Sequence, residues 1–285
     1  MSGLPSVRLA NSDIHITRLI SGANPLCGNS HVSEEMSADM RSYFTDEGVV
    51  KYLLAVQAAG IDTLQARGDY HRVLHWLELF RREGGELKWI VQTASEMHDV
   101  FQNIRVIAAA GATAIYHHGT RTDHYWKTGE IEKVQDYIKC MKDCGVPAGL
   151  ASHIPEVFDY VEDKGWDVDF YMTCFYNLSR EHRESALVTG GAQSSEDHLF
   201  EPEDPARMVR FIQQTQKMCL AFKILGASRR CGTQDEVADA FAYAFAQIKP
   251  IDAVVVGMFP KYLDQIALNV GHTLAACRLS TADAS

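Results

Sequence analysis

Short apolar segments recur along the chain, each following a Gly or Pro that ends a helix-like stretch. The clearest five are residues 60–67, 111–118, 145–153, 165–177 and 250–257. Glycine closes helices in the left-handed conformation at little cost, and a short apolar run without apolar–polar alternation is typical of a strand buried on both faces. Three further segments fit the same role, at residues 17–25, 87–96 and 221–229. Eight such units, most of them separated by enough chain for one helix, predict a (β/α)8 TIM barrel.

The length and composition favour one large domain over residues 1–285. Of the 285 residues, 46% are hydrophobic and 22% are charged, as expected for a single α/β barrel. The net charge of −10 argues against a diffuse basic surface for nucleic acid or an anionic membrane. The N-terminus lacks the layout of a signal peptide, and no apolar run reaches the length of about 18 residues that a membrane span needs. We therefore expect a cytoplasmic protein that acts on a small molecule, and assembly into a homo-oligomer stays open.

Three long segments leave the carboxyl ends of predicted strands and are expected to form loops at the barrel mouth. They are residues 28–48, 119–130 and 178–203, and each is long for a strand-to-helix turn. Thr45, followed by two acidic residues, is a suitable cap for a helix that continues through Val49. Because TIM barrels place their chemistry at this rim, long loops here indicate a binding site.

Titratable side chains stand where several predicted strands end. His118 closes the fourth strand, His153 closes the fifth, and Lys223 is expected within the seventh. Successive strand residues point to opposite faces, so only one of His117 and His118 can face the barrel axis, and the other is expected to pack under a helix. A lysine inside an apolar run is costly unless its amine is paired or used. We therefore predict catalytic roles for His118, His153 and Lys223, with an ion pair at the mouth as the alternative for Lys223.

Two imidazoles and a carboxylate could also hold a divalent metal. His118, His153 and Glu96 each follow a predicted strand, with Asp69 as the alternative carboxylate, and such a set would leave one coordination position open for a substrate. No H-x-H or H-E-x-x-H spacing supports this site. The seven cysteines are dispersed without a C-x-x-C pair, so neither a disulfide framework nor a zinc knuckle is indicated.

The order of these segments resembles the aldo-keto reductase superfamily over nearly the whole chain. Residues 17–28 are similar to that family's opening strand, residues 60–70 to its second-strand motif ending in a tyrosine, and residues 116–119 to its fourth-strand histidine motif. The likeness continues through residues 149–177, 222–229 and 254–269, which resemble the fifth-to-sixth strand passage, the seventh strand, and the eighth strand with its nucleotide-side helix. The resemblance implies a TIM barrel and, if the family role is kept, NADP-dependent reduction of a carbonyl compound.

The catalytic tetrad of that family is only half matched. The resemblance aligns its tyrosine and histidine with Tyr70 and His118, whereas Gln65 stands at the aspartate position and Ala94 at the lysine position. In the family, that aspartate and lysine favour proton donation by the tyrosine. Tyr70 should therefore be a poor proton donor here, although it stays a candidate catalytic residue.

The resemblance also implies contacts to a nicotinamide cofactor. It places five residues at cofactor-binding positions, namely Ser152, Tyr176, Asn177, Gly257 and Asn269. Three neighbouring positions depart from the family pattern, because His153, Thr173 and Leu268 stand where the family has Asn, Gln and Glu. Cofactor binding is thus expected only if the redox role is kept.

These substitutions favour proton transfer over hydride transfer. A neutral imidazole is a suitable base near neutral pH, and a cationic lysine can stabilise an enolate or alkoxide as it forms. We therefore predict a lyase, isomerase or epimerase that acts on a small polar carbonyl or sugar-like substrate, with or without a metal. The alternatives are NAD(P)H-dependent carbonyl reduction, with Tyr70 or Lys223 as proton donor, and a barrel that binds a ligand without catalysis.

Overall fold

The computed structural model describes residues 3–69, 72–94, 97, 99–180 and 199–282. Its strands are β1 (Ser6–Arg8), β2 (His15–Thr17), β3 (Leu19–Gly22), β4 (Thr63–Arg67), β5 (Lys88–Gln92), β6 (Ala114–His117), β7 (Ala148–Ser152), β8 (Phe170–Cys174), β9 (Met218–Phe222) and β10 (Ala253–Gly257). Its helices are α1 (Glu34–Tyr43), α2 (Asp46–Ala58), α3 (Val73–Arg82), α4 (Val100–Ala109), α5 (Gly119–Lys127), α6 (Lys133–Asp143), α7 (Pro155–Asp163), α9 (Asp204–Gln214), α10 (Gln234–Gln247) and α11 (Gln265–Ala282). Within these ranges, no helix combines the length and the apolar character that crossing a membrane requires.

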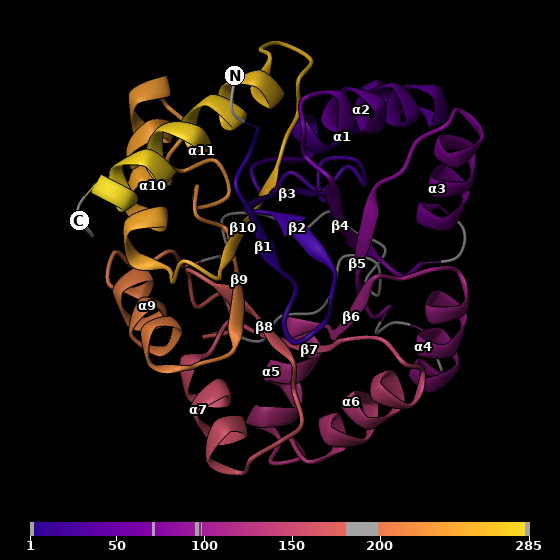
Figure 1. The fold of residues 1–285 in the computed structure, drawn as a ribbon, viewed down its shortest axis with the longest axis vertical. Helices are drawn as coiled ribbons and strands as arrows, with labels where there is room; N and C mark the ends of the chain where they lie inside the picture. Colours follow the sequence, from indigo (N-terminus) through magenta and orange to yellow (C-terminus); the bar gives the residue numbers. More distant parts are fainter. Residues whose placement is uncertain (1–2, 70–71, 95–96, 98, 181–198, 283–285) are drawn as a thin grey trace.

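Eight parallel strands close into a barrel in the order β10-β3-β4-β5-β6-β7-β8-β9. The helices form a ring around them, as Figure 1 shows in a view along the barrel. Each of the eight predicted apolar segments contains or overlaps one barrel strand. The predicted (β/α)8 TIM barrel is therefore confirmed.

The barrel strands are buried on both of their faces, which explains why they lack apolar–polar alternation. One cluster of buried side chains fills the barrel interior and includes Ile90 and Met172, whereas a second lies between the strands and the helices and includes Leu64 and Ala66. On β4, Gln65 and Arg67 alternate with Leu64 and Ala66 and must therefore face the interior. The strand ends therefore decide which polar groups reach the barrel mouth.

An antiparallel hairpin, β1 and β2, precedes the barrel and was not indicated by the sequence pattern. Val7 pairs with Ile16, and β2 leads through one residue into the amino end of β3. Leu9 and Ile16 are fully buried and belong to the cluster inside the barrel. Figure 1 shows the hairpin in front of the centre of the strand ring. The hairpin thus covers the amino end of the barrel, and the mouth is the carboxyl end.

The segment 28–48 is not the loop that we expected, because most of it is helical. Ser33 caps α1 by accepting a hydrogen bond from the Met36 backbone N–H, and Tyr43 and Phe44 pack edge-on against each other at 4.9 Å between ring centroids. The predicted cap at Thr45 is confirmed, since its side chain accepts a hydrogen bond from the backbone N–H of Gly48 at the start of α2. Only Ser37 and Met40 of α1 are buried, so its apolar stripe is too short to show a helical period.

The segment 119–130 is also mostly helical rather than a loop. Helix α5 begins directly after β6 and runs to Lys127. Its buried residues are Gly119, Thr120, Thr122 and Asp123, so the face turned toward the barrel is polar and shows no apolar periodicity. Most of the third predicted loop, residues 178–203, lies outside the described residues.

Packing inside the barrel makes a specific prediction at Gly149. A β-carbon at this position would lie 2.4 Å from the ring of Phe170, which is fully buried. Because overpacking a core costs about 1–3 kcal/mol, Gly149→Ala should lower the free energy of unfolding by about that amount in urea denaturation. Gly271 in α11 is exposed with open space around it, so Gly271→Ala should instead raise stability by about 0.5–1 kcal/mol. Equal stability of Gly149→Ala and the wild type would contradict the packing described here.

Candidate functional site

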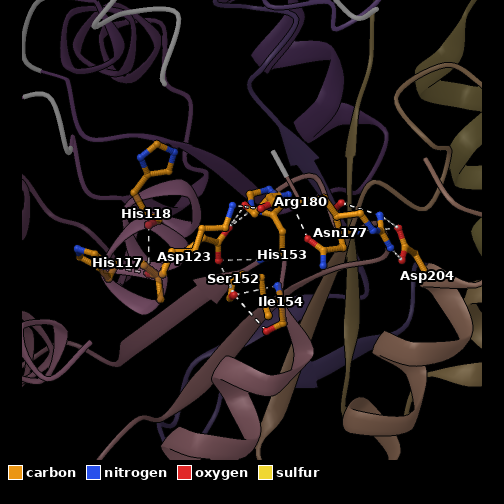
Figure 2. A network of polar contacts seen from close by, with 12 residues as sticks. His117, His118, Asp123, Ser152, His153, Ile154, Asn177, Arg180 and Asp204 are labelled. Carbon is orange, nitrogen blue, oxygen red and sulfur yellow. Dashed lines mark hydrogen bonds and ion pairs between the residues drawn. The ribbon is translucent and has the colours of Figure 1, made fainter. Parts of the chain in front are cut away.

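Asp123 and His153 form a buried, hydrogen-bonded pair at the mouth of the barrel. Asp123 lies on α5, and His153 follows β7. His153 Nδ1 is 2.6 Å from Asp123 Oδ2, and the two side chains are 6% and 2% exposed. Figure 2 shows the pair at the centre of a polar network. Since Nδ1 is held by the carboxylate, Nε2 is the ring nitrogen that can exchange a proton with a ligand.

Three further hydrogen bonds fix the carboxylate of Asp123. Its Oδ1 accepts one from the Ser152 hydroxyl at 2.6 Å and one from the His153 backbone N–H at 3.2 Å. Its Oδ2 accepts another from the hydroxyl of Ser179. Both carboxylate oxygens are therefore engaged, and the imidazole is held in one orientation.

Charge and hydrogen bonding decide the ionisation of Asp123. Burial alone would raise the pKa of this carboxyl, but the His153 imidazolium and the hydrogen bonds from His153, Ser152 and Ser179 outweigh burial and hold the pKa below its usual range. The carboxylate thus remains ionised and stabilises positive charge on His153. An imidazole paired in this way can act as a general base whose protonated form is stabilised by the carboxylate.

The chain reaches this geometry through the junction between β6 and α5. His118 is the N-cap residue of α5, so Asp123 comes little more than one turn into the helix. The helix starts close against β7, because a β-carbon at Gly119 would lie 3.4 Å from both Ala151 Cβ and His153 Cε1. Because α5 follows β6 without a loop, the polar residues of its first turns face the next strand, β7.

The adjacent histidines 117 and 118 take opposite directions, as the alternation predicted. His117 is buried, with Nδ1 2.8 Å from Thr122 Oγ1, and its ring stacks on Tyr137 at 5.1 Å between centroids. Burial, assisted by the positive charge of Arg121, lowers the pKa of His117 to about 3. In Figure 2 the ring of His118 is turned away from the Asp123–His153 pair. His117 is thus the histidine that packs under the helices.

A cavity of about 340 Å³ opens at the mouth beside this network, and Lys223 is on its wall. The prediction that Lys223 lies within a strand is wrong, because β9 begins at Met218 and ends at Phe222. Lys223 follows it with a φ of 60°, in the left-handed region that is uncommon for a non-glycine residue. The cavity is also lined by Phe222, whose ring meets that of His153 edge-on at 5.9 Å. Phe222 therefore connects the cavity wall to His153, while His118 and His153 are not part of this cavity's lining.

The five residues that the resemblance assigned to a cofactor fall into two groups. Gly257 and Asn269 line the cavity. Ser152 is instead bonded to Asp123, and Asn177 donates its backbone N–H to Asp204 Oδ2 at 3.0 Å. Tyr176 is buried with its ring 5.0 Å from that of Phe200. A cofactor role for these residues stays a prediction.

Two of the predicted site residues, Tyr70 and Glu96, lie outside the described residues. Among the residues that are described, no group of three His, Cys, Asp or Glu side chains is arranged to hold a metal ion. Asp123 would make a poor additional ligand, since both of its oxygens accept hydrogen bonds. The metal site with His118, His153 and Glu96 therefore gains no support from this part of the chain.

The sequence analysis missed Asp123, which is the partner that gives His153 its chemistry. No motif or period marks this residue, since it lies in a polar segment that we took for a loop. Its one signal is a buried helical face made of polar residues, which became visible only when α5 was placed against β7.

Comparison with known proteins supports the fold. No protein-family model matches the chain, and no curated protein sequence matches it. A truncated 3-deoxy-D-arabino-heptulosonate 7-phosphate synthase from Thermotoga maritima is similar in structure, with a TM-score of 0.54 and 13% identity over 98% of this chain and 93% of that chain. Dihydropteroate synthase from Xanthomonas albilineans gives a TM-score of 0.53 and 14% identity over 97% and 98% of the two chains. Neither is an aldo-keto reductase, so the resemblance is supported only at the level of the TIM barrel.

The depressed pKa of His117 predicts how stability depends on pH. In the unfolded chain, His117 takes up a proton below about pH 6.5. In the folded protein the pKa of His117 is about 3, so the ring takes up a proton only near that pH. The stability contributed by the neutral ring is therefore present above pH 6.5 and is lost as the pH falls toward 3. His117→Phe should unfold in urea with a smaller loss of stability between pH 6.5 and 4 than the wild type. His15→Gln, which changes an exposed histidine on β2, should keep the wild-type slope, and an unchanged slope in His117→Phe would contradict the assignment.

Proposed function

We propose that this TIM barrel is an enzyme that moves a proton on a small polar carbonyl or sugar-like substrate, as a lyase, isomerase or epimerase. The observation that supports this most directly is the buried Asp123–His153 pair at the carboxyl end of β7. A buried ion pair is costly to form and contributes little to stability compared with apolar packing. Its position at the rim where TIM barrels carry out catalysis favours use as an acid–base group. The same cost weighs against a barrel that only binds a ligand.

In the proposed reaction, His153 is the general base and Asp123 is its positioning residue. Nε2 of His153 removes a proton from the carbon next to the carbonyl, and the electron pair of that C–H bond forms the double bond of an enolate, whose oxygen takes the negative charge. The carboxylate of Asp123 stabilises the imidazolium that forms. Return of the proton to the opposite face gives an epimer, and its delivery to a neighbouring position gives an isomer. His118, which follows the neighbouring strand, is the second candidate acid–base residue.

Lys223 is the candidate group for the enolate oxygen. It lines the cavity at the mouth together with Phe222, whose ring contacts that of His153. Its left-handed backbone is of a kind that costs about 1–3 kcal/mol and tends to occur at functional sites. A cationic amine in a partly closed cavity stabilises a developing oxyanion more strongly than it would in water.

Proton exchange tests this proposal without knowledge of the natural product. Small α-hydroxy ketones and aldoses in D₂O should exchange the proton next to the carbonyl when the wild-type protein is added, as followed by NMR. His153→Ala should slow this exchange at least 100-fold, the scale of general-base catalysis. Asp123→Asn should also slow it and should move the acid limb of the pH–rate profile to lower pH, because the imidazolium loses its carboxylate.

His15→Gln, a change in an exposed histidine on β2 of the hairpin that covers the amino end of the barrel, is the matched control and should leave the rate and the profile unchanged. Exchange that proceeds equally fast in His153→Ala, or an acid limb that does not move in Asp123→Asn, would overturn the assignment of these two residues.

NAD(P)H-dependent reduction is the second candidate, favoured by one observation. Gly257 and Asn269, two of the predicted cofactor residues, line the cavity. Against it, Ala94 is fully buried at the family's lysine position, and Gln65 at the aspartate position donates a hydrogen bond to Tyr116. The aspartate and the lysine that favour proton donation by the tyrosine are therefore both absent.

We expect that NADPH does not quench the fluorescence of the four tryptophans in a saturable way up to millimolar concentration. A cofactor site of the usual kind would instead give a micromolar dissociation constant. Saturable quenching in that range that is lost in Asn269→Ala would replace proton transfer with the redox function.

A further inference from the structure

We infer that the cavity at the barrel mouth binds a neutral, polyhydroxylated part of the substrate, as in an unphosphorylated sugar, through the side-chain amides of Asn269 and Gln65. This inference rests on the proposed function, because it takes the molecule in the cavity to be the substrate, and it narrows the class of that substrate. Asn269 lies on α11 and Gln65 on β4, and both line the cavity. Neither residue has a role in the proton transfer proposed above.

Asn269 carries a buried side-chain amide that the fold does not use. The residue is 5% exposed. Thr273 donates a hydrogen bond at 2.8 Å to its backbone carbonyl, but within the described part of the chain its side-chain amide takes part in no hydrogen bond. A buried amide without a partner is costly, and the large majority of buried polar side-chain atoms in proteins are hydrogen-bonded. An amide of this kind on the wall of a cavity is explained by a ligand that supplies the missing partner.

The amide of Gln65 is held in one orientation by Tyr116. The Tyr116 hydroxyl donates its single proton to Gln92 Oε1 at 3.3 Å, so it can only accept from Gln65, whose Nε2 is 2.7 Å away. Gln65 Oε1 is thereby left as an acceptor, and it accepts no hydrogen bond from the residues that the structure describes. An acceptor on the cavity wall favours a ligand that can donate, such as a hydroxyl, over an ionised carboxylate.

The polar part of the lining consists mainly of neutral groups. Besides the two amides it includes Asn24, Asn29, Ser30, Ser228, Gln234 and Gln265. Among the described residues that line the cavity, none is Asp, Glu or Arg, and there is one lysine, Lys223, and one histidine, His31. Amides and hydroxyls offer both donors and acceptors, as the hydroxyls of a sugar do. Phosphate sites instead favour arginine forks, so this lining suits a neutral polyol better than a phosphate ester.

The size and the apolar walls of the cavity agree with a single sugar-sized molecule. Its volume of about 340 Å³ is at the lower end of the range of about 300–1,000 Å³ for small-molecule sites. Val237 of α10 and Leu268 of α11 add apolar surface for the C–H groups of the ligand. A molecule held by the two amides shares the cavity with Phe222, whose ring meets that of His153 edge-on at 5.9 Å. The hydroxylated part of the substrate and the base are thus connected through one side chain.

Binding measurements on the full chain test this inference without turnover. We would titrate D-glucose, D-fructose and D-xylose, and the 6-phosphate esters of the first two, by saturation-transfer NMR at constant ionic strength. At least one neutral sugar should bind the wild type saturably in the millimolar range, and neither ester should bind more tightly than its parent sugar. Asn269→Leu and Gln65→Met, which keep similar side-chain volumes, should each weaken that binding at least threefold, since a hydrogen bond to the ligand is lost. Asn11→Leu, which changes an exposed asparagine between β1 and β2, is the matched control and should bind as the wild type does.

Urea denaturation of the ligand-free protein separates a binding role of Asn269 from a structural one. Asn269→Leu should not lower the denaturation midpoint, because it replaces an unpaired buried amide with an apolar side chain. A midpoint that falls would assign the amide to the fold and overturn its role in binding. The inference is also overturned if no neutral sugar binds at about 100 mM, if an ester binds more tightly than its parent sugar, or if the folded Asn269 and Gln65 variants bind as tightly as Asn11→Leu. His153→Ala should keep the sugar binding, so a failure of the proton-transfer proposal leaves this result intact and can be told apart from it.

Discussion

Closure of the parallel sheet is the constraint on which the rest of this structure depends. Once eight strands form a barrel, each strand has one face against the helices and the other against the interior, and neither reaches water. Apolar side chains must then occupy both faces, and polar groups can stand only where the strands end. The amino end is filled by Leu9 and Ile16 of the hairpin. The carboxyl end is therefore the place where His153, Lys223 and Arg67 can be accommodated.

The Asp123–His153 pair shows what such accommodation requires. Taking an ionised carboxylate out of water costs several kcal/mol, and the structure offsets this with the hydrogen bond to His153 and with hydrogen bonds from two serines and one backbone N–H. The inner face of α5 is polar rather than apolar and carries Asp123. At the junction between β6 and α5, His117 is hydrogen-bonded to Thr122. The helix is consequently held to the barrel by polar contacts that tolerate little substitution, since removal of one partner of a buried pair costs about 3–5 kcal/mol.

The sequence predicted the elements that depend on local pattern and missed those that depend on tertiary contacts. The eight strands were recognisable because burial on both faces removes alternation, and the cap at Thr45 because capping is a local hydrogen bond. Helix α5 was missed since its buried face carries Thr122 and Asp123 in place of apolar residues. The hairpin was missed because its strands have three residues each, too few for a period to appear. His153 was found by its position, but Asp123 could not be, because their 29 intervening residues hide a contact that only closure of the barrel creates.

The positions of the charged groups around the mouth restrict what kind of substrate could use them together. In the strand order, β4 and β7 are separated by β5 and β6 on one side, so Arg67 and His153 lie across the mouth from each other rather than side by side. Phe222 contributes to the cavity wall and contacts the ring of His153, which couples the shape of the cavity to the position of the base. A substrate acted on by both Lys223 and His153 would therefore contact the Phe222 ring, which lies against the imidazole.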